Sequence, residues 1–437
     1  MGDNCVELYI TMNLFETSRQ VTVLGAGMVG VSCALALQAK GWRVTLVDRR
    51  QPGEETSHGN AGVLSRSSLL PFNRPGLWAA LPSMLMKGSP ALKLRASGLK
   101  NWPWLLKFLW HAQRSSFEKS SVALDALIQM SMRTHRDWMA QAHAENLCRD
   151  TGWLWLYSSL EAFDGSSTSR EILQDFSVDM EVLTAHELTD LEPHIAPRFS
   201  HALWIKDAVS VSHPGALVKA YAQQFIQAGG VFQVQEVRAI SQQPAGWQWH
   251  TASGHEHRTP NLVVAMGPWS DTLLSASQLA KPHRTCLGFE RGYHRHFKPV
   301  AGMHLGRPIY DTAGAFVLSP MQNHAGQDTL RLSTGVEMAA QDAVFNAQQL
   351  DAAEHAARKV FPLKEAIASS DWLGSRPTTP DSRPVIGEMP ACAGLWLAYG
   401  HQHIGFSTGP GTGVLLSELM SSESTSIDPR PFSPARF

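Results

Sequence analysis

The chain has 437 residues and a formal net charge of -1 at pH 7, so it carries no basic field that would attract nucleic acid. Its length allows two domains or one large two-lobed unit. The five cysteines form no Cys-x-x-Cys pair, which fits a reducing compartment and argues against a disulfide framework or a thiolate zinc site. Without an apolar run of about 18 residues, no membrane span is expected.

The first predicted unit is a strand, a glycine-rich turn and a helix. The apolar run Val21–Leu24 leads into Gly25-x-Gly27-x-x-Gly30, and an Ala- and Leu-rich helix is expected from Met28 to Lys40. The three glycines suit a tight turn, a close backbone approach to a pyrophosphate, and close packing of helix on strand. The helix N-terminus offers free N–H groups and a partial positive charge. This unit predicts a dinucleotide site.

A second buried parallel strand is expected over 43–48, and it ends at Asp48. A carboxylate at this position can accept a hydrogen bond from a ribose hydroxyl. It would repel a 2′-phosphate, so NADP is disfavoured and NAD or FAD remain. The loop Ser57-x-x-Asn60-Ala61-Gly62 then suits close passage beside a bulky ligand.

The middle of the chain reads as a mixture of helices and strands. Mostly helical structure is expected over 71–147, strands over 153–157 and 176–183, a helix over 214–229, a strand over 231–240 and a hairpin-like stretch over 247–251. A short buried strand over 261–267 ends in small residues at Gly267. Ligands of open α/β sheets sit at the carboxyl ends of strands, so this segment and the first glycine turn could face one cofactor.

The last third of the sequence changes character. Alternating strands over 288–297, 308–319 and 330–337 predict a mostly antiparallel sheet with one face available to a ligand. A helix is expected over 342–360. Glycine-rich loops follow, with a strand over 395–399 and a closing helix from about Pro410.

Three separated motifs carry a family resemblance. They are Gly25-x-Gly27-x-x-Gly30 with Asp48, the middle run Val263-Val264-Ala265-Met266-Gly267-Pro268-Trp269-Ser270, and the closing Gly374-Ser375-Arg376-Pro377 through Gly400-His401-Gln402-His403-Ile404-Gly405. This order resembles the FAD-dependent D-amino acid oxidase superfamily over residues 20–420. The Ser57 loop and Arg291-Gly292-Tyr293-His294 look most like its bacterial D-amino acid dehydrogenase branch.

The resemblance implies an α/β fold in which a Rossmann-like, discontinuous FAD-binding domain is interleaved with an antiparallel-sheet substrate domain. The expected FAD-binding ranges are 20–66, 200–275 and 371–425, and the substrate-binding ranges are 67–199 and 276–370. Residues 1–19 are expected to be a flexible extension.

The cofactor implied is non-covalently bound FAD. Backbone N–H groups of residues 404–407, next to the closing helix, are expected to donate to flavin O2. The positions expected to bind FAD are Gly25, Ala26, Gly27, Met28, Val29, Gly30, Asp48, Arg49, Ser57, Asn60, Ala61, Gly62, Val63, Val237, Ala265, Met266, Gly267, Trp269, Gly374, Arg376, His401, Ile404, Gly405, Phe406 and Ser407.

Arg376 is the first candidate for binding the substrate carboxylate, because a guanidinium offers a planar two-pronged donor and relatives use the Arg of this element. The alternative is an Arg paired within the FAD domain. Tyr293 and His294 are expected on a strand over the flavin, although a core-packed Tyr is equally plausible. Tyr310 is a weaker candidate of the same kind. No general base is named.

Histidine pairs such as His401 and His403 could suggest a metal, but no third or fourth ligand stands at a convincing spacing, so no metal is expected. His58 could contact flavin or substrate, or be an exposed loop residue. The tryptophans at 102, 104 and 110 near several lysines could mark peripheral membrane contact, or a buried aromatic cluster.

The function implied is oxidation of an amino acid, in particular a D-amino acid, by hydride transfer from its α-carbon to flavin N5. The imino acid would hydrolyse to a 2-oxo acid and ammonia, a step of amino acid catabolism. Electrons would leave to a quinone or another non-oxygen acceptor. Alternatives are oxidation of a secondary amine such as proline, hydroxyproline or an N-methyl amino acid, an oxygen-using oxidase, or a flavin-binding subunit of a multi-chain dehydrogenase. The expected location is the cytoplasm or the inner face of the membrane. The oligomeric state stays open.

Overall fold

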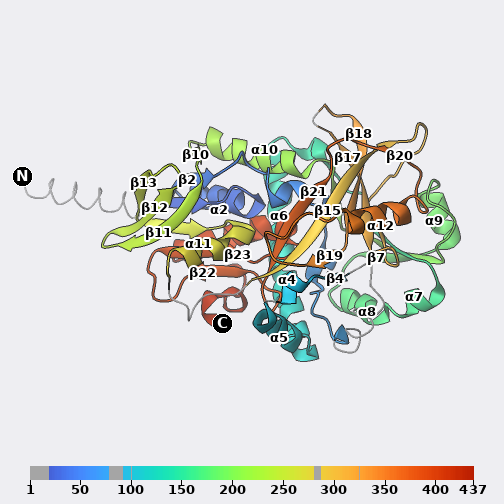
Figure 1. The fold of residues 1–437 in the computed structure, drawn as a ribbon, viewed down its shortest axis with the longest axis horizontal. Helices are drawn as coiled ribbons and strands as arrows, with labels where there is room; N and C mark the ends of the chain where they lie inside the picture. Colours follow the sequence, from blue (N-terminus) through green and yellow to red (C-terminus); the bar gives the residue numbers. More distant parts are fainter. Residues whose placement is uncertain (1–18, 78–91, 100, 280–286, 324) are drawn as a thin grey trace, which may run out of the picture.

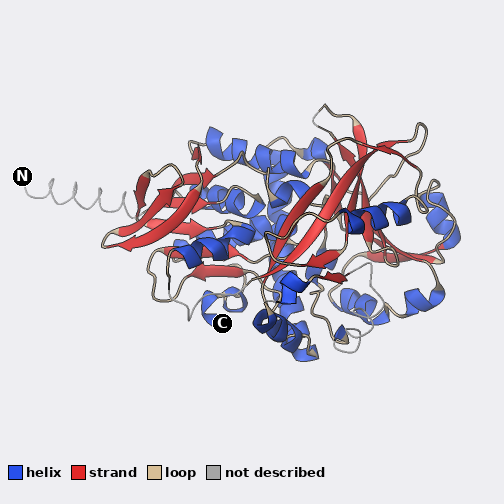
Figure 2. Cartoon of the chain, viewed as in Figure 1, coloured by secondary structure: helices blue, strands red, loops and turns tan. Residues whose placement is uncertain are grey.

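The computed structural model describes residues 19–77, 92–99, 101–279, 287–323 and 325–437. Figure 1 shows an elongated molecule with a smaller sheet and its helices toward one end, a larger sheet toward the other, and the long helix α6 (Arg114–Gln141) between them. Apart from Arg19, the predicted extension over 1–19 lies outside the described residues. Figure 2 shows strands and helices in both halves of the molecule.

The smaller sheet has six strands and is parallel except at one edge. Its spatial order is β10 (Val231–Val234), β2 (Arg43–Asp48), β1 (Gln20–Leu24), β14 (Asn261–Val264), β23 (Leu395–Tyr399) and β22 (Val385–Glu388). The central strands β1 and β14 pair in register from Val21 with Asn261 to Leu24 with Val264. Both therefore end at the same edge, where ligands of α/β sheets bind.

Both faces of this sheet are covered, as its apolar strands require. Val21 and Val23 face one core with the helices α2 (Met28–Ala39), α10 (Pro214–Gln227) and α13 (Gly405–Met420). Leu24 points the opposite way, into a core with α11 (Ser270–Ala276) and a three-stranded sheet. That sheet consists of β11 (Val237–Gln243), β12 (Gly246–Thr251) and β13 (Glu256–Thr259).

The larger sheet has eleven strands and is mostly antiparallel. Its main path is β4 (Leu92–Leu94), β19 (Val336–Met338), β15 (Gly288–Pro299), β18 (Asp328–Thr334), β17 (Phe316–Gln322), β16 (Ile309–Asp311), β6 (Trp153–Tyr157), β8 (His201–Ile205) and β7 (Met180–Thr184). Two further strands, β20 (Leu363–Ala366) and β21 (Trp372–Thr378), pair with β15. Helix α12 (Ala347–Ala357) packs against this sheet through Ala353 and Ala357.

The other elements are short or peripheral. A small sheet is formed by β3 (Val63–Leu64), β9 (Val209–Val211) and β5 (Cys148–Arg149). The remaining helices are α4 (Ala96–Leu99), α5 (Trp102–Trp110), α7 (Leu160–Asp164), α8 (Ser167–Asp175) and α9 (Ala185–Leu191). In the described ranges, no helix is both long enough and apolar enough to cross a membrane.

The predicted fold class is confirmed, and several predicted elements differ in their bounds. The strand expected over 231–240 is two strands, because β10 joins the six-stranded sheet and β11 starts the three-stranded one. The strand expected over 308–319 is likewise two, β16 and β17, which pair antiparallel after a turn. The helix expected over 342–360 spans only Ala347–Ala357.

The closing helix begins at Gly405, so the prediction of a start near Pro410 was wrong. Pro410 is the sixth residue of α13 and cannot donate to the Phe406 carbonyl, which instead lies 3.0 Å from His135 Nε2. Both β8 and β21 fall in ranges predicted for the FAD-binding domain, but they hydrogen-bond into the larger sheet. The division of the chain into domain ranges stays a prediction.

Candidate active site

One elongated cavity of about 1600 Å³ lies at the carboxyl edge of the six-stranded sheet and reaches the larger sheet. It is larger than the roughly 300–1,000 Å³ of common small-molecule sites, so it has room for a dinucleotide and a small substrate together. The sequence-predicted cofactor positions that line it are Gly25, Gly27, Met28, Val29, Asp48, Arg49, Ser57, Asn60, Ala61, Val63, Val237, Ala265, Met266, Gly267, Trp269, Gly374, Arg376, His401, Gly405, Phe406 and Ser407.

The four other predicted cofactor positions lie behind this wall. A Cβ on Gly30 would lie 1.8 Å from the Gly25 carbonyl oxygen, and one on Gly62 would lie 2.4 Å from the Val211 oxygen. The Ala26 N–H donates to Asp48 Oδ2 at 2.6 Å. Ile404 is the N-cap residue of α13. Their contribution is to hold the backbone that faces the cavity.

The first glycine turn fits a pyrophosphate. Gly25 has φ +105°, a conformation that L side chains rarely adopt, and a Cβ there would lie 2.4 Å from the Ala265 oxygen. Gly25 N donates to the Val47 oxygen at 2.7 Å. The turn thus brings the ends of β1, β2 and β14 together at the N-terminus of α2. The residues present fit the phosphates of FAD.

Asp48 ends β2 on the same cavity wall. Its two carboxylate oxygens accept from the N–H groups of Ala26 and Arg50 at 2.6 and 3.0 Å. Burial raises the pKa of Asp48, and these hydrogen bonds and Arg49 oppose the rise. The Arg49 guanidinium lies 4.1 Å from the centre of the Trp269 ring, and both residues line the cavity. These positions suit the ribose and adenine end of the cofactor.

The loop over 57–62 is fixed by α2, by a hydrogen bond within the loop and by the larger sheet. Ser57 Oγ accepts from the Met28 N–H at 2.9 Å, and Asn60 Oδ1 accepts from the Gly62 N–H at 2.8 Å. From the larger sheet, Ser319 Oγ donates to the Ala61 oxygen at 2.7 Å. This loop passes along the cavity without a regular ladder, so side chains supply the partners of its backbone.

Arg331 of β18 is the main anchor of that loop. Its Nη1 donates to the carbonyl oxygens of His58, at 2.8 Å, and of Asn60, while its Nε donates to His296 Nε2 at 3.0 Å. Burial lowers the pKa of Arg331 to about 9, and burial together with Arg331 lowers that of His296 to about 3. At neutral pH a charged guanidinium therefore binds a neutral imidazole and two carbonyls.

A second helix N-terminus points at the cavity. Gly405, Phe406 and Ser407 form the first turn of α13 and line the cavity. The first hydrogen bond into this turn runs from Thr408 N to the Ile404 oxygen at 2.9 Å, so the three preceding N–H groups have no acceptor within the helix. With the partial positive charge of the helix end, they suit an electronegative edge of the flavin.

Arg376 of β21 lines the cavity wall opposite these elements. A Cβ on Gly292 of β15 would lie 2.3 Å from Arg376 Nη2, so the missing side chain at 292 is what admits the guanidinium. Among the described residues, no hydrogen bond or ion pair at 4.0 Å or less is made by this guanidinium. Burial lowers the pKa of Arg376, opposed by the charge of Glu290. A buried guanidinium without a bonded partner is suited to a carboxylate ligand.

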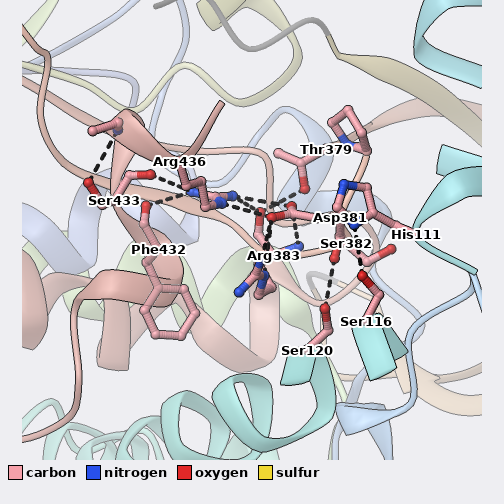
Figure 3. A network of polar contacts seen from close by, with 12 residues as sticks. His111, Ser116, Ser120, Thr379, Asp381, Ser382, Arg383, Phe432, Ser433 and Arg436 are labelled. Atoms are coloured by element: carbon pink, nitrogen blue, oxygen red, sulfur yellow. Dashed lines mark hydrogen bonds and ion pairs between the residues drawn. The ribbon is translucent and has the colours of Figure 1, made fainter. Parts of the chain in front are cut away.

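The turn after β21 is held by a buried polar network, shown in Figure 3. Asp381 lies between Arg383 and Arg436, each 2.8 Å from its Oδ2, and its carbonyl oxygen accepts from Ser120 Oγ of α6 at 3.0 Å. Burial alone would raise the pKa of Asp381, but the two arginines hold it below its usual range. The network fixes the end of the strand that carries Arg376 to the chain terminus and to α6.

The other predicted substrate residues differ in placement. Tyr293 lines the cavity, and its hydroxyl donates to Glu337 Oε2 at 2.7 Å. Tyr310 also lines it, 6.3 Å from the Trp153 ring. His294 is not part of the cavity wall; it is 2% exposed and stacks on Trp372 with ring centres 4.9 Å apart. Their contacts with substrate stay predictions.

The histidines do not gather as a metal site. Within the described parts of the chain, no three His, Cys, Asp or Glu side chains are grouped as a metal ion needs. His401 Nε2 lies 2.9 Å from Thr412 Oγ1, and His403 packs on Phe72 with ring centres 4.4 Å apart. His58 lies between His213, His294 and Trp372, so it is neither fully exposed nor a wall residue.

Several wall residues were not predicted as cofactor or substrate contacts. They are Glu290, Trp153, Trp155 and Trp372, while His403 was considered only as a metal ligand. Glu290 could have been found from its strand, since it lies two positions before Gly292 and so shares its face. The aromatic residues gave no comparable signal, because packing of strands far apart in sequence brings them to the cavity.

A Rossmann-type sheet with a glycine turn, and a cavity shared with a mostly antiparallel sheet, define a dinucleotide-binding oxidoreductase. The chain belongs to the FAD dependent oxidoreductase family (DAO), whose model matches residues 20–419. It is therefore an FAD-dependent oxidoreductase that acts on amino groups.

Two relatives and one solved structure illustrate the similarity. A D-amino-acid oxidase of Bradyrhizobium diazoefficiens is 32% identical over 96% of this chain and 99% of its own length. A D-amino acid dehydrogenase of the same organism is 26% identical over 94% of this chain and 96% of its own. Glycine oxidase from Geobacillus kaustophilus has the same fold, with a TM-score of 0.71 and 21% identity over 96% of this chain and 99% of that one.

We expect FAD affinity to depend on the hydrogen bonds that Arg331 of the larger sheet makes to the 57–62 loop. Arg331→Met removes the donors to the His58 and Asn60 carbonyls, so the loop loses its fixed position, and FAD affinity should fall about tenfold or more, which is about 1.4 kcal/mol. Titration of the apoprotein with FAD, followed by flavin fluorescence, measures this.

Arg307→Met is the matched control, because Arg307 pairs with Glu192 and lies outside the cavity wall. It should reduce stability without changing FAD affinity. Equal FAD affinity in Arg331→Met and the natural protein would show that the loop does not need this anchor.

Proposed function

We propose that the protein oxidises a D-amino acid at its α-carbon, with FAD as hydride acceptor and with electrons leaving to a non-oxygen acceptor such as a quinone. The observation that supports this most is the Arg376 guanidinium, which lines the cavity without a bonded partner among the described residues. The similarity to a D-amino-acid oxidase and a D-amino acid dehydrogenase of Bradyrhizobium supports the D-amino acid part of the proposal.

Arg376 binds the substrate carboxylate in this proposal. Two parallel N–H donors fix both oxygens of a carboxylate and therefore its orientation, which a Lys cannot do. Gly292 and the Asp381 network hold the guanidinium in place. Bound FAD supplies the acceptor for the hydride from the α-carbon at N5, and the imino acid formed hydrolyses to a 2-oxo acid and ammonia.

The rest of the wall serves orientation and charge. The free N–H groups at the start of α13 would stabilise negative charge that develops on a bound flavin. The rings of Tyr310, Trp153 and Trp155 line the cavity from the larger sheet. Such an aromatic wall favours an apolar substrate side chain and excludes water from the reacting carbon.

Three alternatives differ from this proposal in the acceptor, in the substrate or in the need for partner chains. Oxygen is the alternative acceptor, favoured by the name of the 32% identical relative, a D-amino-acid oxidase. A secondary amine such as proline, hydroxyproline or an N-methyl amino acid presents the same carboxylate to Arg376. A flavin-binding subunit in a larger dehydrogenase would bind FAD and need partner chains for turnover.

An anaerobic bleaching experiment separates these possibilities. D-amino acids should reduce the flavin of the holoenzyme, seen as loss of its absorbance, while the L enantiomers leave it oxidised. A screen that includes proline, hydroxyproline and N-methyl amino acids is the comparison set. Bleaching by secondary amines alone would contradict the D-amino acid proposal, and peroxide release at the turnover rate would contradict the non-oxygen acceptor.

Arg376→Met should keep FAD bound and weaken the substrate by about thirtyfold or more, since truncating one partner of a buried charge pair costs about 2–5 kcal/mol. Arg376→Lys should recover only part of this, because it cannot make the two-pronged contact. The apparent affinity is read from the concentration dependence of flavin reduction. Arg430→Met is the control, since Arg430 is exposed and pairs with Asp428. Unchanged affinity in Arg376→Met would remove the role given to Arg376.

We also propose that α5 contacts a lipid surface, which a quinone acceptor would require. Trp102, Leu106 and Trp110 are 62%, 53% and 67% exposed and lie four residues apart, so they share one helix face. Trp104, by contrast, is buried. The alternative of a buried aromatic cluster therefore holds for Trp104 but not for Trp102 or Trp110.

The doubly substituted Trp102→Ser, Trp110→Ser protein should sediment less with phosphatidylglycerol-containing vesicles than the natural protein does. Substitution of the exposed Val344 by Ser should change nothing. Equal sedimentation of all three proteins would contradict a lipid-binding role for α5.

A further inference from the structure

Glu290 is a buried carboxylate of the cavity wall that the proposed function has not used; the wall residues Glu55 and Glu236 are instead ion-paired with Arg49 and Arg238. Glu290 lies on β15, lines the same cavity as Arg376 and is 2% exposed. Its Oε2 is buried and has no hydrogen-bond partner among the described residues. A carboxylate oxygen left without a donor is costly in a protein interior, so a ligand that supplies a donor would be stabilising there.

The strand register places Glu290 beside Arg376. The antiparallel pairing of β15 with β21 sets Glu290 directly opposite Arg376 and Gly292 opposite Gly374. Directly opposite residues point to the same face, with Cβ atoms about 4.5–5.5 Å apart. The Arg376 guanidinium lies over Gly292, two positions along β15, so a cation and a carboxylate stand next to each other on one wall.

Few charged groups surround Glu290. From β21 it meets Arg376; from β19 its neighbour is Met338, and from α5 the Trp104 ring packs on Gly288. His403 faces Arg376, and burial and that charge lower its pKa to about 3, so it is neutral. Burial raises the pKa of Glu290 to about 7, against the opposing effects of the Arg376 charge and of the neighbouring Thr378 hydroxyl. The carboxyl group can therefore hold or release a proton near neutral pH.

We propose that Glu290 binds the ammonium group of a zwitterionic amino acid and accepts one proton from it while Arg376 binds the carboxylate. This inference rests on the proposed function, since it concerns the substrate of the same site. The positive Arg376 and the negative Glu290 are complementary in charge to the carboxylate and the ammonium group of an amino acid. An amino acid carries its carboxylate and amine on one carbon, so adjacent wall groups can reach both.

One N–H bond of the ammonium breaks, its electron pair stays on nitrogen, and the proton forms an O–H bond on Glu290. The neutral amine then uses its lone pair to form the C=N bond as hydride leaves the α-carbon with two electrons for FAD, the oxidant. The proton on Glu290 returns to solvent. A carboxylic acid without an amine would instead leave two negative groups together beside one guanidinium.

The first experiment needs no turnover. Propionate, a carboxylate without an amine, is titrated into the oxidised holoenzyme and followed by the change in flavin absorbance. Ionised Glu290 repels the carboxylate of propionate. The affinity for propionate should therefore fall about tenfold for each pH unit above about pH 7. In Glu290→Gln the affinity should stay within about twofold from pH 6 to pH 8.5, because the amide carries no charge.

The second experiment follows flavin reduction by the substrate against pH. The rate constant at low substrate should rise through about pH 7 in the natural protein and lose that inflection in Glu290→Gln. Near pH 7 the variant should react about a hundredfold more slowly and recover toward the pKa of the amine, as expected for loss of a general base. The Glu290→Asp variant should keep an inflection in the plot of this rate constant against pH, because it keeps a carboxyl group.

Glu365→Gln is the control, because Glu365 is exposed and pairs with Lys298 at the far end of the same strand. It should leave both pH dependences unchanged. The inference is overturned if Glu290→Gln keeps the pH dependence of propionate binding, or changes only the apparent substrate affinity, as a purely structural residue would. Failure of every amino acid to reduce the natural protein would overturn the proposed function instead, and the propionate titration would still decide whether Glu290 titrates in the site.

Discussion

The close approach of three backbone segments at one sheet edge is the constraint on which this structure depends. Gly25, at the end of β1, touches Ala265 after β14, and Gly30 of α2 packs on the Gly25 carbonyl. No side chain fits between these segments, so the first turn of α2 is brought to the edge where Asp48 ends the neighbouring strand. The cavity at this edge exists because the backbone, rather than a layer of side chains, forms its wall.

The larger sheet completes the site through β15 and its partners. Strand β15 pairs with β18 and β20 along one half and with β19 and β21 along the other, and β21 brings Arg376 to the cavity. A central strand with partners on both sides is hard to displace, because many ladder hydrogen bonds would break together. The position of the guanidinium is therefore set by sheet register and by the Asp381 network, not by a flexible loop.

Much of this could be predicted from the sequence. The first strand, turn and helix could be predicted from their local sequence pattern. Strand β23 at Leu395–Tyr399 was predicted with its observed bounds. Patterns that depend on distant partners were harder. The single strand expected over 231–240 is divided because its halves join different sheets, and α13 starts one turn and more before Pro410 since the glycine-rich segment packs closely on α2. At the site, Arg376 was marked by its motif, whereas Glu290 gains its meaning only from the register of β15 on β21.

The hydrogen bonds that cross from β17 and β18 to the 57–62 loop have a mechanical consequence. Ser319 and Arg331 bind the carbonyls of Ala61, His58 and Asn60, so the wall of the cofactor cavity is tied to the opposite lobe. Separation of the two lobes by a hinge motion would break the buried hydrogen bonds of Arg331 with the His58 and Asn60 carbonyls. Any opening between the lobes at this loop would therefore leave buried carbonyl groups and a buried guanidinium without their hydrogen bonds.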